Sequence, residues 1–252
     1  MRIRYISNSD YFKAVPGQIF CYWLSDIALE HMKKDKKLDD KGRAKQGLST
    51  SDNNRFLRLW HEVRFSNIDF SCKSCEETEN SICRWFPYNK AGNFRRWSSI
   101  NEYVVNYQNN GAEIKATVMK KYPYLNGPGF VVKNTESYFH HGITWNDVAT
   151  GLFCARYVPD GFIFADAGPM FFCSDDFLML GFFNTNVFQM FASIICQGLH
   201  YSTGHIPQIP FQEVDDNDKD KVKQLTVENY ELSKSEWDSF ENSWDFKRHP
   251  LV

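Results

Sequence analysis

The chain has 252 residues, of which 42% are hydrophobic and 16% aromatic, and its formal net charge is −2. A chain of this length and composition can bury a sizeable core, which excludes general disorder and predicts one large domain with appendages. The near-neutral charge excludes a protein that is basic over its whole surface, so any nucleic-acid contact has to come from a local patch.

The N-terminal segment, residues 1–43, is predicted to be a connector with one short helix. Residues 1–15 have no clear pattern, and Pro16-Gly17 is a turn signal. The pattern from Ile19 to about His31 favours a helix. The charge run at residues 33–43 predicts a solvated loop. The apolar side of the short helix would consist of Phe20, Trp23, Leu24 and Ile27.

Residues 44–211 are predicted to form one α+β domain, a mixed sheet with packed helices. Strand-like patterns occupy residues 101–107, 129–133 and 162–165. The longest predicted helix runs from Asp175 to Cys196, with Ser174 or Asp175 as its cap and apolar residues at helical spacing. Glycines and prolines then favour an extended segment up to residue 211.

Residues 212–252 are predicted to form an acidic linker and a short C-terminal helix. The run QEVDDNDKD at 212–220 indicates an exposed linker. Ser233 and Glu236 have the spacing of a capping box, which predicts a helix over about 232–246. Trp237, Phe240 and Trp244 would share one face of this helix and form a docking surface for a partner.

The sequence also bounds the cellular compartment. No apolar signal segment is present at the N-terminus, and no run reaches the roughly 18 apolar residues of a membrane span. The seven cysteines are an odd number without a secretory context, which indicates reduced thiols. We therefore expect a cytoplasmic protein without membrane contact.

Two segments combine arginines with aromatic residues. The first, KQGLSTSDNNRFLRLWHE at residues 45–62, has a glycine turn at Gly47, a polar loop, and then arginines beside a tryptophan. The second, RWFPYNKAGNFRRW at residues 84–97, has cations that can contact phosphates and amides that can contact base edges. The alternatives are an ordinary exposed loop and an aromatic turn with snorkelling arginines.

Other chemistries lack their patterns. Cys72 and Cys75 have zinc-ligand spacing and Cys83 follows, but the second pair of a structural zinc site is missing. No glycine-rich phosphate loop and no Asn-Pro-Pro-aromatic motif is found. The sequence therefore predicts no catalytic residue, no metal site and no cofactor site in this chain.

Six blocks in order resemble a known family. They are KQGLSTSDNNRFLRLWHEV, RWFPYNKAGNFRRW with NEYVVNYQNNGAEIK, NTESYFHHGITW, ARYVPDGFIFADAG, LMLGFFNTNV and SKSEWDSFENSWDFKRHPLV. From about Pro16 to Val252 the chain resembles the C-terminal target-recognition region of the adenine-specific DNA methyltransferases of BREX phage-defence systems, the PglX type. The family's Asn-Pro-Thr-like segment after the LGFFN block is replaced here by ICQGLHYSTGHIPQIP.

The resemblance implies a module that recognises double-stranded DNA in a restriction–modification-like system in bacteria. In the family, the catalytic domain that binds S-adenosylmethionine precedes this region, so we expect the chain to be a split, excised or truncated piece. It would act only with a methyltransferase domain or other defence proteins supplied in trans. The alternatives are part of an enzyme, a protein-interaction fragment or decoy of the defence complex, and a decayed remnant.

The residues expected to contact DNA are cations, amides, hydroxyls and tryptophans. They are Lys45, Ser49, Thr50, Asn53, Arg55, Arg58, Arg84, Lys90, Asn93, Arg95, Arg96, Trp97, Asn134, Thr144, Trp145 and Arg156. Phosphates would be held by Arg55, Arg58, Lys90, Arg95, Arg96 and Arg156, so binding should weaken steeply with salt. The candidates for base-edge or groove contact are Ser49, Thr50, Asn53, Asn93, Asn134, Thr144 and Trp145.

Overall fold

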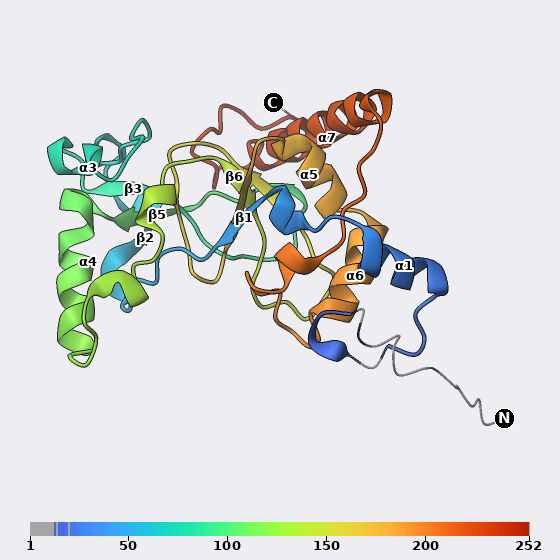
Figure 1. The fold of residues 1–252 in the computed structure, drawn as a ribbon. Coiled ribbons are helices and arrows are strands. Elements are labelled where there is room, and N and C mark those ends of the chain that lie inside the picture. The colour runs from blue at the N-terminus through green and yellow to red at the C-terminus, as the bar shows by residue number, and fades with distance from the viewer. Residues whose placement is uncertain (1–12, 14, 20, 252) are drawn as a thin grey trace.

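Two β-sheets and seven α-helices make up the part of the chain that the computed structural model describes, residues 13, 15–19 and 21–251 (Figure 1). The fold is α+β, as predicted. The helices are α1 (Asp26–Lys34), α2 (Asn53–Phe56), α3 (Glu77–Asn80), α4 (Gln108–Lys121), α5 (Asp176–Phe183), α6 (Asn186–Ile195) and α7 (Asp216–Trp237). Short 3-10 helices occupy Pro16–Gln18, Leu38–Asp40, Trp60–Glu62, Phe65–Asn67, Pro128–Phe130, Thr135–Ser137 and Ile206–Gln208.

The strands of the two sheets interleave along the chain. The five-stranded sheet has the order β1 (Gly42–Lys45), β9 (Met170–Cys173), β6 (Gly142–Thr144), β7 (Arg156–Val158) and β4 (Trp97–Ser98). The four-stranded sheet has the order β2 (Leu57–Leu59), β5 (Tyr103–Asn106), β3 (Trp85–Asn89) and β8 (Ile163–Phe164). Both sheets are mixed, because β4 pairs with β7 and β3 pairs with β8 in parallel. The predicted strands at 101–107 and 162–165 are confirmed, shorter at their ends.

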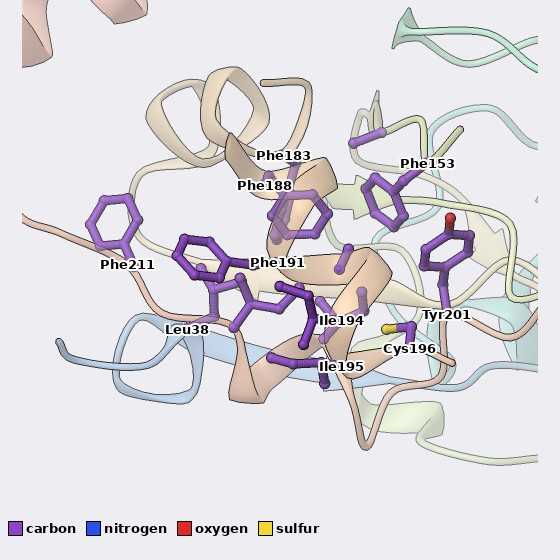
Figure 2. Packing of buried hydrophobic residues seen from close by; sticks show 14 of the residues in the cluster. Leu38, Phe153, Phe183, Phe188, Phe191, Ile194, Ile195, Cys196, Tyr201 and Phe211 are labelled. Carbon is purple, nitrogen blue, oxygen red and sulfur yellow. The ribbon is translucent and has the colours of Figure 1, made fainter. Parts of the chain in front are cut away.

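The structure has two hydrophobic cores, and the five-stranded sheet contributes to both, through Phe171 to the first and Met170 to the second. The first core lies between the five-stranded sheet and α1, α5 and α6, and it is rich in phenylalanine (Figure 2). Leu38, Phe183 and Phe188 are fully buried or nearly so there. The second core lies between the four-stranded sheet and α4, through Ile114 and Val118. In Figure 1, α4 therefore lies at one end of the molecule and α1 and α6 at the other.

The predicted helix over 175–196 is broken into α5 and α6, which are bent by 71°. The break occurs because Thr185 starts a new helix, its side chain accepting a hydrogen bond from the Phe188 amide at 3.1 Å. In the described part of the chain, no single helix has the length and apolarity of a membrane span. The α5–α6 pair passes that test only as one bent unit.

Three predictions near the N-terminus and in the middle need correction. The first helix runs over Asp26–Lys34 rather than 19–31, because Ser25 caps it by accepting from the Ala28 amide. The charge run at 33–43 is not simply a loop, since Leu38 inserts into the first core. Residues 129–133 form a 3-10 turn at Pro128–Phe130 instead of a strand. Phe20 and most of the connector 1–15 lie outside the described residues.

The acidic run is the start of a long helix rather than a linker. The Asp215 carboxylate accepts a hydrogen bond from the Asp218 amide at 2.9 Å and caps α7, which continues for 22 residues. Carboxylates in a first helical turn also interact favourably with the helix dipole. The helix packs on α5 at Gly181, where an added Cβ would lie 2.6 Å from the Thr226 hydroxyl oxygen. The division into three segments stays a prediction.

The predicted C-terminal aromatic face does not form. Because α7 ends at Trp237, Ser233 and Glu236 lie in its last turns and cap no N-terminus. Trp244 stacks on Phe162 with ring centroids 5.9 Å apart and packs against the second core. Phe240 is 49% exposed, and Trp237 is half-buried. The three side chains therefore share no helix face, and we withdraw the proposed docking surface.

Candidate nucleic-acid interface

The loop at residues 46–54 is fixed against the second core at its base. The Leu48 amide donates to the Phe164 carbonyl at 2.8 Å, and the Ser49 amide donates to the Val131 carbonyl at 3.1 Å. Gly47 approaches so closely that a Cβ would lie 1.9 Å from the Phe164 carbonyl oxygen. The glycine is thus required for close approach, not for the positive φ that the sequence suggested.

Three arginines lie beyond this loop, of which Arg55 and Arg84 are exposed and Arg58 is half-buried. The Arg55 and Arg84 guanidinium groups both reach the Glu113 carboxylate on α4, at 3.3 and 3.1 Å. Their side chains remain 55% and 51% exposed. Arg58 donates to the carbonyls of Asn54 and Leu57, both at 2.6 Å, and its guanidinium lies 5.9 Å from the Trp85 ring centroid.

A lysine of α4 extends this positive surface. The Lys121 ammonium donates to the Ser51 carbonyl at 2.7 Å, and the Arg55 guanidinium donates to the Thr117 hydroxyl at 3.4 Å. Positions 113, 117 and 121 repeat every four residues, so they share one helix face. We call Arg55, Arg58, Arg84 and Lys121, together with Glu113, the α4 arginine surface. It carries four cations and one carboxylate.

The rest of the second cationic segment, after Arg84, is placed differently. The Arg95 guanidinium pairs with the Glu236 carboxylate at 2.7 Å and donates to the Ser233 carbonyl, and its side chain is only 18% exposed. The Arg96 carbonyl accepts from the Ser233 hydroxyl at 3.1 Å. Both contacts come from α7. The Lys90 ammonium lies 4.4 Å from the Tyr103 ring centroid.

Four predicted contact residues, Thr50, Thr144, Trp145 and Arg156, are buried. Arg156 is 3% exposed, and its guanidinium donates to the Asn146 side-chain oxygen at 2.7 Å and the Asn93 carbonyl at 3.3 Å. Burial lowers the pKa of its guanidinium. Thr144 and Trp145 are fully buried. Buried side chains cannot touch a DNA that binds this surface, so these four are not among the contacts that the structure supports.

The remaining predicted residues divide by exposure. Asn53 and Asn93 are exposed, and the buried Thr50 donates its hydroxyl to the Asn53 side chain. The Lys45 ammonium is bound by the Glu136 carboxylate at 2.9 Å. Ser49, Trp97 and Asn134 are half-buried.

The sequence analysis missed the α4 members of this surface. Glu113, Thr117 and Lys121 lie far along the chain from Arg55, and α4 itself was not predicted. A left-handed turn at Asn109–Gly111 begins the element and obscures its helical pattern. The four-residue spacing of polar residues after Gly111 was the signal that could have found it.

The cysteines and histidines form no metal-binding cluster among the residues that the structure describes. All seven cysteines are free thiols. Burial raises the pKa of Cys72 and of Cys75 to about 11, so both are protonated at neutral pH.

Comparison with known proteins relates the chain to part of larger enzymes. No protein-family model matches it. It is 31% identical over 252 residues to the adenine-specific methyltransferase PglX of Lacticaseibacillus casei (strain Zhang). The matched region covers 98% of this chain and 20% of that protein. It is 32% identical over 247 residues to the adenine-specific methyltransferase BrxX of Escherichia coli O9:H4 (strain HS). Here the matched region covers 96% of this chain and 18% of that protein. The chain therefore spans about a fifth of the length of these curated relatives.

Proposed function

We propose that this chain is the part of a BREX-type adenine-specific DNA methyltransferase that recognises a specific sequence in double-stranded DNA. Its similarity to two adenine-specific methyltransferases over nearly its whole length supports the methyltransferase context. The α4 arginine surface supports the DNA contact, and it is the observation on which the proposal depends most.

The charge balance of this surface suits a polyanion. Arg55 and Arg84 share one carboxylate, so one positive charge of that trio is uncompensated. Arg58 and Lys121 contact carbonyl groups rather than acids. Planar guanidinium groups bind phosphate through two parallel hydrogen bonds, and half-exposed pairs exchange their partner at small cost.

Sequence discrimination would come from exposed polar side chains. Asn53 lies beside Arg55, and Asn93 lies in the second cationic segment. Amide groups can donate to and accept from a base edge in the major groove. Each correct base contact would then contribute on the order of 1–3 kcal/mol of discrimination.

The proposal places methyl transfer and the binding of S-adenosylmethionine in another polypeptide or in the rest of a longer one. The chain would act with a methyltransferase domain or other defence proteins in the cytoplasm. None of its residues is assigned a catalytic role.

The proposal is tested by titrating the chain with duplex DNA at several salt concentrations. The double variant Arg55→Ala/Arg84→Ala should weaken binding to all duplex sequences alike, since it removes phosphate contacts. The slope of log affinity against log salt should become shallower by roughly 2, about one for each cation removed. Arg43→Ala is the control, because Arg43 lies on β1 and is a 66% exposed arginine whose guanidinium pairs with the Asp39 carboxylate. Equal affinity of the double variant and the control would contradict the proposal.

A second candidate function has one observation in its favour. An apolar groove of about 400 Å³ lies between α5, α6 and α7, lined by residues such as Phe182, Val187 and Leu225. Exposed apolar surface of this kind marks contact with another protein. If the wild-type chain binds no duplex at low salt, a protein-interaction fragment becomes the better conclusion.

A further inference from the structure

A hollow of about 260 Å³ lies beside the α4 arginine surface. The 46–54 loop forms one of its walls, and the segment after α4 forms the other. The lining residues are Ser49, Ser51, Tyr122, Tyr124, Leu125, Phe130, Val131, Lys133 and Asp166. None of the aromatic members has a role in the proposed function so far.

The hollow has unusually exposed aromatic rings. Tyr124 is 77% exposed and Phe130 is 73% exposed. The Tyr122 and Tyr124 rings meet edge to face with centroids 6.1 Å apart, so Tyr122 supports the orientation of Tyr124. Exposing large aromatic surface to water is unfavourable, and rings placed in this way recur where a flat ligand stacks.

The polar groups of the hollow can meet the edge of such a ligand. The hydroxyls of Ser49 and Ser51 make no hydrogen bond within the described part of the chain, so they are free to donate and accept. The Lys133 ammonium and the Asp166 carboxylate, 3.1 Å apart, supply a charged donor and a charged acceptor. The Ser49 position is fixed by the bond from its amide to the Val131 carbonyl.

The hollow is continuous with the α4 arginine surface. Ser51 lines the hollow, and its carbonyl accepts from the Lys121 ammonium at 2.7 Å. Thr117, the partner of Arg55, precedes Lys121 by one helical turn, or about 6 Å along the axis. A nucleic acid held by Arg55 would therefore pass within about one nucleotide's reach of the hollow.

We propose that this hollow binds one nucleobase that has left the base stack of the bound DNA. Stacking on the exposed rings of Tyr124 and Phe130 would replace the lost base–base contacts. The serines, Asp166 and Lys133, whose ammonium lies 5.8 Å from the Phe130 ring centroid, would bind the base edge. The inference rests on the proposed function, because the α4 arginine surface delivers the DNA. Aromatic stacking of a base typically contributes about 1–3 kcal/mol.

The test compares two duplexes of the same sequence. In one, every base is paired; in the other, one base faces an abasic site and is already easily unstacked. The wild-type chain should bind the second duplex roughly 10-fold more tightly, the affinity equivalent of about 1.4 kcal/mol. Tyr124→Ala/Phe130→Ala should lose this preference while keeping its affinity for the fully paired duplex.

Two further variants complete the experiment. Tyr124→Leu/Phe130→Leu keeps apolar bulk but removes the rings, and it should also lose the preference if stacking is the cause. Phe240→Ala removes a 49% exposed aromatic side chain after α7 and should keep the preference. Thermal melting checks that each variant is folded.

The outcomes separate the two proposals. If the wild-type chain binds both duplexes equally, or if the alanine variant keeps the preference, the base-binding hollow is refuted and duplex recognition stands. If neither duplex binds at low salt, both proposals fail together.

Discussion

The two arginine-rich segments of this chain have similar composition but opposite environments. In the first, residues 45–62, Arg55 and Arg58 are directed to the surface, and Arg55 shares the Glu113 carboxylate with Arg84 from the start of the second. Further along the second segment, the Arg95 guanidinium is held by the Glu236 carboxylate at the end of α7. Arg156, from a third part of the chain, is buried beneath the second segment, bonded to the Asn93 carbonyl.

This difference shows that availability depends on what the rest of the chain supplies. Glu236 lies 141 positions after Arg95, and it converts a candidate phosphate contact into a link between a loop and a helix. On the α4 arginine surface, by contrast, Arg55 and Arg84 share the single Glu113 carboxylate, so positive charge remains there. Arginines from segments of similar composition are thus either held by the protein itself or left with part of their charge uncompensated.

The largest effect is expected at the base of the first segment. Gly47→Ala should destabilise the fold by at least about 3 kcal/mol, because its Cβ would lie 1.9 Å from the rigid Phe164 carbonyl oxygen. Gly92→Ala, in the second segment, has no atom within 4 Å of its Cβ and should change stability by less than about 0.5 kcal/mol. Urea unfolding measures both. Similar stability of the two variants would show that the first loop is not fixed as described.

The next largest effect compares the loss of stability on replacing buried Arg156 with that on replacing half-buried Arg58. Arg156→Ala should cost about 2–4 kcal/mol, because it opens a cavity and removes the donor of the hydrogen bonds to the Asn146 side-chain oxygen and the Asn93 carbonyl, leaving the Asn146 oxygen with only the longer bond from the Gly92 amide. Arg58→Ala should cost less than about 1 kcal/mol, but it should weaken duplex binding. The folded Arg156 variant should bind duplex DNA as tightly as the wild type. A selective loss of DNA affinity with unchanged stability in Arg156→Ala would reverse the comparison.

Removing the acidic partner of each arginine, Glu113 or Glu236, also tests which arginines are available to DNA. Glu113→Gln should raise duplex affinity roughly 3- to 10-fold at low salt, because it removes the one acid of the α4 arginine surface. Glu236→Gln should change duplex affinity less, since Arg95 keeps its bond to the Ser233 carbonyl. Gel-shift titration of both variants gives the ranking, and an equal increase would mean that Arg95 is as available as Arg55.

Local sequence patterns predicted the fold class and two of the strands, because those depend on short-range alternation of apolar residues. They failed where one side chain ends or begins a helix. Thr185 divides a continuous apolar run into α5 and α6, and Asp215 turns an acidic run into the cap of α7. Composition alone cannot distinguish an acidic linker from an acidic helix start.

The sequence drew attention to the arginines of the 45–62 segment but not to the residues that lie beside them. The 45–62 segment does reach the surface with its arginines, as its polar loop suggested. The residues that lie beside this segment come from α4, through Glu113. Arg95 is withdrawn from the surface by its contact with Glu236 of α7. Both are long-range contacts that no local pattern contains. The exposed rings of Tyr124 and Phe130 became noticeable only once the fold placed them beside Ser49 and Lys133.

The smallest effect concerns Lys45, which stands between the two kinds of cation. A hydrogen bond from its ammonium lowers the pKa of Glu136 from the ordinary value of 4.5, against the opposing effect of burial. Because the folded pKa lies below the unfolded one, this stabilisation is present above pH 4.5 and is lost as the pH falls through the folded value. Glu136 is 64% exposed, so salt should screen the effect and keep it small. An NMR titration should find the Glu136 carboxyl titrating below 4.5 in the wild type and near it in Lys45→Ala. If the two titrations coincide, Lys45 is not bound by Glu136 and joins the cations available to DNA.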